Sequence, residues 1–187
     1  MSFAPLPDAQ WPGQIADMRA GFAGQLNVYR VMAHHPALLR AWETLRTHIV
    51  QHSALGPERA EVGILRLAHR LGAAYEWNQH VVRGLRAGLD VARIRSLRGP
   101  CAQMSPEDAL LAGAVDALQD HAQLAPDQMD ALQALVGREG VLDLMATLGM
   151  YMTLGFILKS TNCPLEQDIA AQMATVPEDL PMPQAPD

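Results

Sequence analysis

The stretch that decides the fold is EVGILRLAHRLGAAYEWNQHVVRGLRAG, residues 61–88. Its first part carries apolar residues on more than one helical face, which is typical of a central, buried helix. Gly72 interrupts this pattern and Gly88 ends the second part, because glycine readily takes the left-handed conformation that follows helix C-termini. We therefore predict two consecutive helices that fold into an antiparallel hairpin about residues 72–74.

Helical signals also dominate outside this stretch. Helices are expected over about residues 14–25, 27–34, 90–97, 105–121, 126–137 and 140–160, and another begins at Pro36. Three residues are of the type that caps helices: Asn27, Asp90 and Ser105. The helix after Pro36 has one apolar stripe, formed by Leu38, Leu39, Trp42, Leu45 and Ile49. No run of alternating β-branched residues favours a sheet, so the sequence predicts an all-α fold.

The chain divides into three segments. Residues 1–13 form an N-terminal arm spaced by prolines, and residues 14–175 form a single helical domain. Residues 176–187 are rich in proline and acid and are expected to be an arm or a disordered tail. A chain of 187 residues is long enough for one well-filled core.

Composition excludes several classes of function. The net charge of −6 argues against nucleic acid as a partner, because phosphate binding needs clustered positive charge. The most apolar stretch, residues 141–158, contains Asp143 and two glycines, which favours a buried helix over a membrane span. Residues 1–10 lack the pattern of a signal peptide, so we expect a cytoplasmic protein without a membrane partner.

Cysteine and histidine spacing indicates no metal site. Cys101 and Cys163 lie far apart and form no CxxC pair, which disfavours a disulfide framework or a thiolate zinc site. His48 and His52 are four apart, as metal ligands on a helix can be, but no third ligand accompanies them.

The strongest chemical signal is the pair Glu76 and His80. Residues four apart share a helix face, and a carboxylate beside an imidazole can orient the ring and raise its basicity. Tyr75 and Trp77 flank the pair and could limit water, and the hairpin could bring Glu61 to the same region. The alternative from spacing alone is a Glu–His pair on a solvated face.

Residues 61–88 resemble the core of the carboxymuconolactone decarboxylase family, also called AhpD-like. The upstream run NVYRVMAHHP (residues 27–36), the GMYM run from residue 149 and the sequence CPLE from residue 163 resemble it too. The resemblance implies an AhpD-like helical bundle with a central hairpin. It also implies a homo-oligomer, since family members usually assemble as trimers or hexamers.

The family has a thiol-dependent peroxidase branch with a glutamate, a CxxC motif and a histidine. By this resemblance Glu61 takes the glutamate place and His80 the histidine place, whereas Ala73 and Glu76 take the cysteine places. Peroxide reduction needs a reactive thiolate and a resolving thiol, and neither alanine nor glutamate supplies one. The second branch removes CO2 from a carboxylated muconolactone without a cofactor.

We therefore expect a cofactor-free, acid–base lyase on a small carboxylated or lactone substrate, with no metal. In this reading His80 delivers the proton and Glu76 or Glu61 orients it. Arg83 and Arg86 could hold a substrate carboxylate, although we expect them on a solvated face. Further residues are assigned to the substrate pocket: Tyr75, Trp77, His69, His34 and Tyr151. An AhpD-like peroxidase and a non-catalytic small-molecule binder remain as alternatives.

Overall fold

The computed structural model describes residues 3–183 and shows no strand within them, so the all-α prediction is confirmed. The α-helices are α1 (Phe22–Gln25), α2 (Asn27–Met32), α3 (Pro36–Thr47), α4 (Pro57–Leu71), α5 (Ala74–Ala87), α6 (Val91–Ser96), α7 (Pro106–His121), α8 (Pro126–Thr161) and α9 (Gln167–Met173). Four shorter turns of 3-10 or π-helix accompany them, namely η1 (Asp8–Gln10), η2 (Gly13–Met18), η3 (His48–His52) and η4 (Cys101–Gln103).

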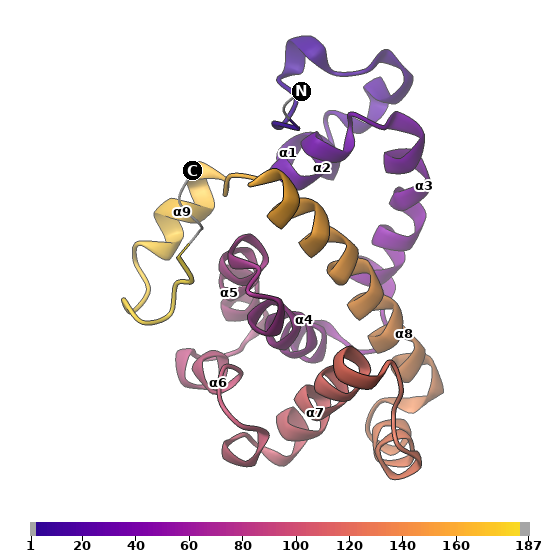
Figure 1. The fold of residues 1–187 in the computed structure, drawn as a ribbon, viewed down its shortest axis with the longest axis vertical. Coiled ribbons are helices and arrows are strands. Elements are labelled where there is room, and N and C mark those ends of the chain that lie inside the picture. Colours follow the sequence, from indigo (N-terminus) through magenta and orange to yellow (C-terminus); the bar gives the residue numbers. More distant parts are fainter. Residues whose placement is uncertain (1–2, 184–187) are drawn as a thin grey trace.

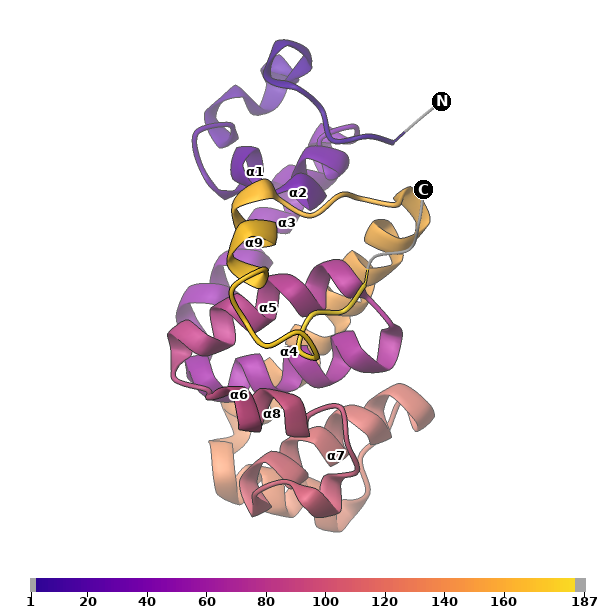
Figure 2. The same ribbon diagram turned by 90° about the vertical axis from the view of Figure 1, so that its left-hand side faces the viewer.

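The predicted hairpin forms at the centre of the molecule, where α4 and α5 lie side by side (Figures 1 and 2). Gly72 ends α4 with a φ of 59°, a left-handed conformation that lets the chain reverse within two residues. Leu65 of α4 and Trp77 and Val81 of α5 have no exposed surface. Because α7 and α8 also pack against α4, that helix has neighbours on several sides, which explains its broad apolar surface.

The long helix α8 runs past the hairpin and closes one side of the core (Figure 1). It is kinked at Gly137, where the sequence predicts the end of one helix before the start of the next. The helix is long and apolar enough to cross a membrane, but 56% of its most apolar window is buried inside the protein. Its Asp143 accepts a hydrogen bond from the Ala54 N–H at 2.6 Å and lies 2.7 Å from His48 Nε2, which fastens η3 to α8.

The prediction of one helix over residues 14–25 is wrong. Ile15 has non-helical backbone angles inside η2, and α1 begins only at Phe22. A Cβ on Gly24 would lie 1.9 Å from the carbonyl oxygen of Arg19, so the chain folds tightly back on itself here. A continuous helix does not allow that close approach.

The expected N-cap role of Asn27 is also wrong. Asn27 is the first residue of α2, and its side chain caps no helix. Its N–H donates to Glu166 at 2.6 Å and its side-chain amide donates to the carbonyl of Pro164 at 2.9 Å. A contact with the segment after α8, distant in sequence, therefore replaces the local cap. Asp90 and Ser105 do cap their helices, by accepting from the N–H groups of residues three further on.

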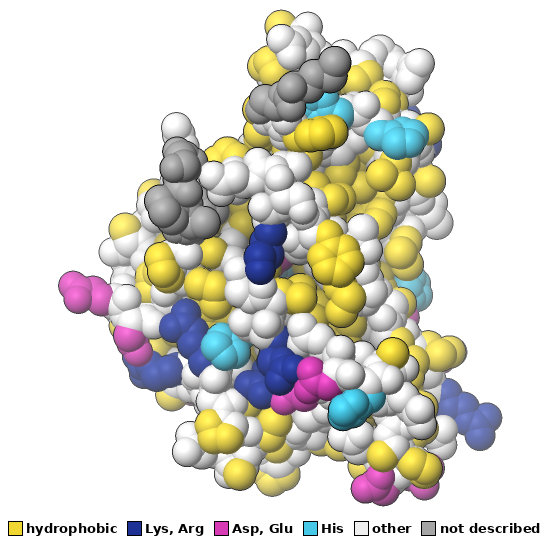
Figure 3. All heavy atoms as spheres, in the orientation of Figure 1, with side chains coloured by type: hydrophobic (Ala, Val, Ile, Leu, Met, Phe, Trp, Pro, Cys, Tyr) yellow, Lys and Arg dark blue, Asp and Glu magenta, His cyan; other side chains and the backbone are white. Residues whose placement is uncertain are grey.

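Only part of the predicted apolar stripe of α3 is buried in the core. Leu39 is fully buried, whereas Leu38 and Leu45 each expose 42% of their surface. Phe156 of α8 is 59% exposed and lines, with Leu38, an open apolar groove of about 490 Å³. Hydrophobic side chains gather over the region of α3 and α8 in Figure 3.

The C-terminal segment, expected as an arm or a disordered tail, lies against the outer face of α5 as far as Pro183. The indole N–H of Trp77 donates to the carbonyl of Leu180, and the side-chain amide of Asn78 exchanges two hydrogen bonds with the backbone of Met182. Figure 2 shows this segment passing over α4 and α5. Residues 184–187 lie outside the described part of the chain.

Candidate active site

One face of α5 carries three residues that could do chemistry. Glu76, His80 and Arg83 are four and three positions apart, so successive helical turns bring them to the same side. The opposite side carries Trp77 and Asn78, which the C-terminal segment covers. The helix thus separates a structural face from a face directed at α2, α3 and α8.

His80 stands between two carboxylates. Its Nδ1 lies 2.7 Å from Glu61 Oε2 on α4, and its Nε2 lies 3.4 Å from Glu76 Oε2. The ring is 2% exposed. Burial alone would lower the pKa of His80, but the charge of the Glu61 carboxylate and the hydrogen bonds that the ring donates to Glu61 and Glu76 outweigh burial and raise the pKa above its ordinary value. An imidazolium that donates to both carboxylates is the form that this geometry favours.

Tyr151 of α8 covers the imidazole. The two rings meet edge to face with centroids 4.9 Å apart and an interplanar angle of 87°. Burial raises the pKa of Tyr151 far above its ordinary value, so its phenol stays protonated. Tyr151 therefore limits the access of water to His80.

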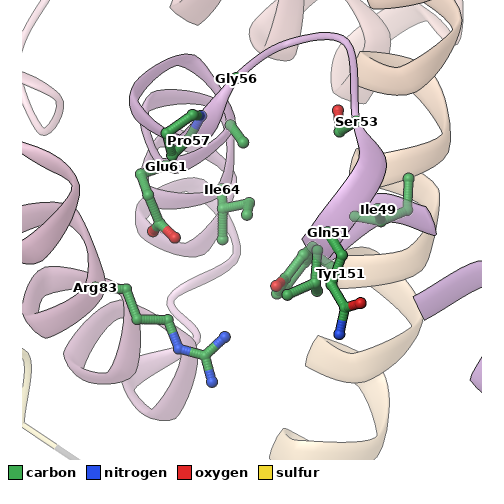
Figure 4. A pocket seen from close by; sticks show the side chains of 11 residues that line it. Ile49, Gln51, Ser53, Gly56, Pro57, Glu61, Ile64, Arg83 and Tyr151 are labelled. Carbon is green, nitrogen blue, oxygen red and sulfur yellow. The ribbon is translucent and has the colours of Figure 1, made fainter. Parts of the chain in front are cut away.

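A pocket of about 160 Å³ opens beside this cluster (Figure 4). Glu61 of α4, Arg83 of α5 and Tyr151 of α8 line it, together with Gln51 and Ser53 of the η3 region. Apolar walls come from Ile49, Pro57, Ala60 and Ile64. In Figure 4 the side chain of Arg83 reaches toward the space that Gln51 and Tyr151 bound on the opposite side.

His80 and Glu76 do not line this pocket. They border a second, much smaller void of about 20 Å³, large enough for a single water molecule. Val50, Arg83 and Tyr151 line both spaces and so separate them. Of His80 and the two carboxylates beside it, Glu61 is therefore the one that lines the pocket, and His80 lies directly behind it.

The structure brings only some of the predicted site residues together. Glu61, Glu76, His80 and Tyr151 form one cluster, and Tyr75 borders the small void while its hydroxyl donates to Glu166 at 2.5 Å. The remaining three lie elsewhere, on neither space: Trp77 under the C-terminal segment, His69 against the edge of Trp77, and His34 in the open apolar groove.

The sequence did not indicate several residues that surround His80. The expectation that Arg83 lies on a solvated face is wrong, because the side chain is half-buried in the pocket wall, whereas Arg86 is exposed as expected. Tyr29 of α2 and Arg46 of α3 border the small void. Their helices lie more than 30 residues away from His80 in sequence, and no spacing signal links them to it.

Neither cysteine can take part in this site. Cys163 is buried, and burial together with the nearby carboxylate of Glu166 raises the pKa of its thiol to about 12. Burial also raises the pKa of Cys101, which lies beside Asp116. Within residues 3–183, no group of three potential metal ligands comes together.

Comparisons with known proteins show which proteins this arrangement is similar to. A sequence profile of the carboxymuconolactone decarboxylase family matches residues 36–120, whereas a search of curated proteins finds no match. A cysteine-to-alanine variant of the debrominase Bmp8, in complex with 2,3,4-tribromopyrrole, is similar in structure with a TM-score of 0.74 and 16% identity. That similarity covers 93% of this chain and 96% of that chain.

Apo Bmp8 is similar as well, with a TM-score of 0.72 and 15% identity over 92% of this chain and 96% of that chain. At such identities the similarity concerns the fold and not the activity. The chain therefore has the AhpD-like helical fold, and its residues 36–120, which contain the hairpin with Glu61, Glu76 and His80, match the carboxymuconolactone decarboxylase family.

Proposed function

We propose that this protein is a cofactor-free, acid–base lyase that acts on a small carboxylated or lactone substrate. The observation that carries the proposal is the Glu61 carboxylate in the wall of a pocket, backed at 2.7 Å by a buried imidazole whose pKa is raised. This pair can hold a proton at the edge of a partly apolar cavity and release it to a substrate.

The reaction would proceed in two steps. The bond to the departing carboxylate breaks, CO2 leaves, and the electron pair passes into the conjugated lactone. A proton from the pair of Glu61 and His80 then reaches the resulting carbanion carbon, and solvent restores it. Because His80 is recessed and Glu61 borders the pocket, Glu61 makes the contact with substrate and His80 supplies and orients the proton. The interpretation from spacing differs in one point, because there His80 itself delivers the proton to the substrate.

The position of the thiols disfavours the peroxidase alternative. Peroxide attack requires a thiolate, and the raised pKa values of Cys101 and Cys163 keep both thiols protonated at neutral pH. Neither cysteine lines the pocket that contains Glu61.

The test is CO2 release from a carboxylated muconolactone by the wild type and by Glu61→Gln and His80→Gln. General acid–base catalysis contributes about 10²- to 10⁴-fold, so each variant should lose at least about 10²-fold in kcat. Glu107→Gln, which alters a surface ion pair with Arg59, is the matched control and should keep full activity. Unchanged turnover in Glu61→Gln, or no turnover by the wild type, would refute the proposal.

We also propose that the protein assembles with further copies of itself through the exposed apolar surface of α3 and α8. Leu38, Leu45, Leu142 and Phe156 on these helices expose between 42% and 66% of their surface. Such a surface is unusual on a monomer and suits a subunit interface. Light scattering on the wild type and on Phe156→Glu tests this, and a wild-type monomer would refute it.

A further inference from the structure

We infer that Arg83 forms a carboxylate-binding site in the wall of the 160 Å³ pocket, and that the pocket takes small planar carboxylic acids in an orientation set by this arginine. The inference rests on the proposed function for its catalytic meaning. The binding site itself stands on the geometry of the pocket.

The first argument is that Arg83 lacks a direct partner. No hydrogen bond or ion pair joins its guanidinium to another of the described residues, although the side chain is only partly exposed. Two other recessed arginines contrast with it: Arg66 holds both oxygens of Asp116, and Arg93 holds both oxygens of Asp108. A recessed guanidinium without such a fork is costly unless a ligand completes it.

The second argument is that Arg83 keeps its charge in this place. Burial alone would lower its pKa, but the combined influence of Tyr151, Glu61, Glu76 and Tyr29 raises the pKa above its ordinary value. A permanent cation with five N–H donors in a planar fork binds a carboxylate through two parallel hydrogen bonds. The chemical complement of this wall is therefore a planar anion.

The third argument comes from the rest of the pocket. Ile49 and Ile64 provide apolar surface for a ring, and Gln51 and Ser53 supply polar groups on the η3 side. Glu61 repels a carboxylate and Arg83 attracts one, so a carboxylate that anchors the ligand is expected at Arg83. An acid whose carboxylate meets Arg83 and whose unsaturated body lies across Ile64 would present its reacting carbon near Glu61 (Figure 4).

The experiment uses two probes of similar size and shape, the anion benzoate and the neutral benzamide, measured by titration calorimetry against the full-length protein. Benzoate should bind the wild type, and Arg83→Gln should weaken its binding at least tenfold. Benzamide should bind weakly and with equal affinity to both proteins. Arg86→Gln is the matched control, because Arg86 lies one turn further along α5, is exposed and donates a hydrogen bond to Gln172. Arg83→Lys keeps the charge without the fork and should fall between the wild type and Arg83→Gln.

The outcomes separate this inference from the proposed function. If Glu61→Gln and His80→Gln bind benzoate but the wild type turns over no carboxylated lactone, the lyase proposal fails and the anion site remains. If a lactone is decarboxylated equally well by a folded Arg83→Gln, this inference fails and the lyase proposal remains. Absence of benzoate binding by the wild type, or an equal loss in Arg86→Gln, would overturn the Arg83 site. Circular dichroism melting curves establish that each variant folds.

Discussion

The contact between Glu61 and His80 predicts a stability difference that depends on pH. Glu61→Gln keeps the shape of the side chain and can still accept a hydrogen bond from a neutral imidazole. It removes the negative charge 2.7 Å from a ring that is 2% exposed. Burial then dominates, so the pKa of His80 in the variant should fall below its ordinary value instead of lying above it.

The size of the stability difference between the wild type and Glu61→Gln follows from the burial of Glu61 and His80. Removing one member of a buried ion pair costs about 3–5 kcal/mol, and we take the lower end, about 3 kcal/mol, because Glu76 remains beside the ring. Surface screening reduces it little, since the side chain of Glu61 is only 13% exposed.

The direction in which folding changes the pKa of His80 determines the pH range of the stability difference. A histidine whose pKa is raised on folding contributes stability that is fully present below its unfolded value of about 6.5 and is lost as the pH rises through the folded value. The wild type should therefore exceed Glu61→Gln in stability by about 3 kcal/mol near pH 5.5. The gap should narrow at alkaline pH, where the imidazole is neutral in both proteins.

Urea unfolding at a series of pH values measures the gap, and an NMR titration of the imidazole protons measures the pKa of His80 directly. Glu107→Gln serves as the control, because its partly exposed pair with Arg59 should contribute at most about 1 kcal/mol at any of these pH values. A gap that is constant across the pH range, or an unchanged pKa of His80 in Glu61→Gln, would show that the two groups are not coupled as described.

Three further predictions concern the surroundings of the site. Asn78→Ala removes both hydrogen bonds to the backbone of Met182 and should lower the free energy of unfolding by about 2 kcal/mol, measured by urea unfolding. A loss below about 0.5 kcal/mol would mean that Asn78 does not hold the C-terminal segment. Burial alone would raise the pKa of Asp143, but hydrogen bonds from the Ala54 N–H and from His48 outweigh burial and lower the pKa. The ionised carboxylate therefore stabilises the fold above its unfolded pKa of about 3.9, and this stabilisation is lost as the pH falls through the pKa of the folded state. Asp143→Ala should therefore destabilise the protein by about 1–3 kcal/mol at pH 7 and by less at pH 3, and an equal effect at both would contradict the assignment. Cys163 should react with a disulfide reagent at pH 7 only as fast as the protein unfolds, and rapid labelling of the native protein would revive the peroxidase alternative.

Local sequence patterns determined the elements that carry the site. Gly72 marks the reversal between α4 and α5, and the four-residue spacing of Glu76 and His80 determines that they share a face. Both features depend on helix periodicity and on the conformational freedom of glycine, which act within a few residues. The same reasoning failed for residues 14–25, where the close approach of Gly24 to Arg19 breaks the helix.

Only the tertiary structure decided what surrounds that face. The packing of α2, α3 and α8 against the hairpin buries His80 and places Arg83 in a pocket wall. The same packing brings Tyr29, Arg46 and Tyr151 to the site. The spacing of residues on a helix face is the same whether solvent or another helix covers that face. Its neighbours set the dielectric environment, and with it the pKa values and the reach of each charge. For that reason the Glu–His pair could be found from its spacing, whereas the identity of the group that borders the pocket, Glu61, required the fold.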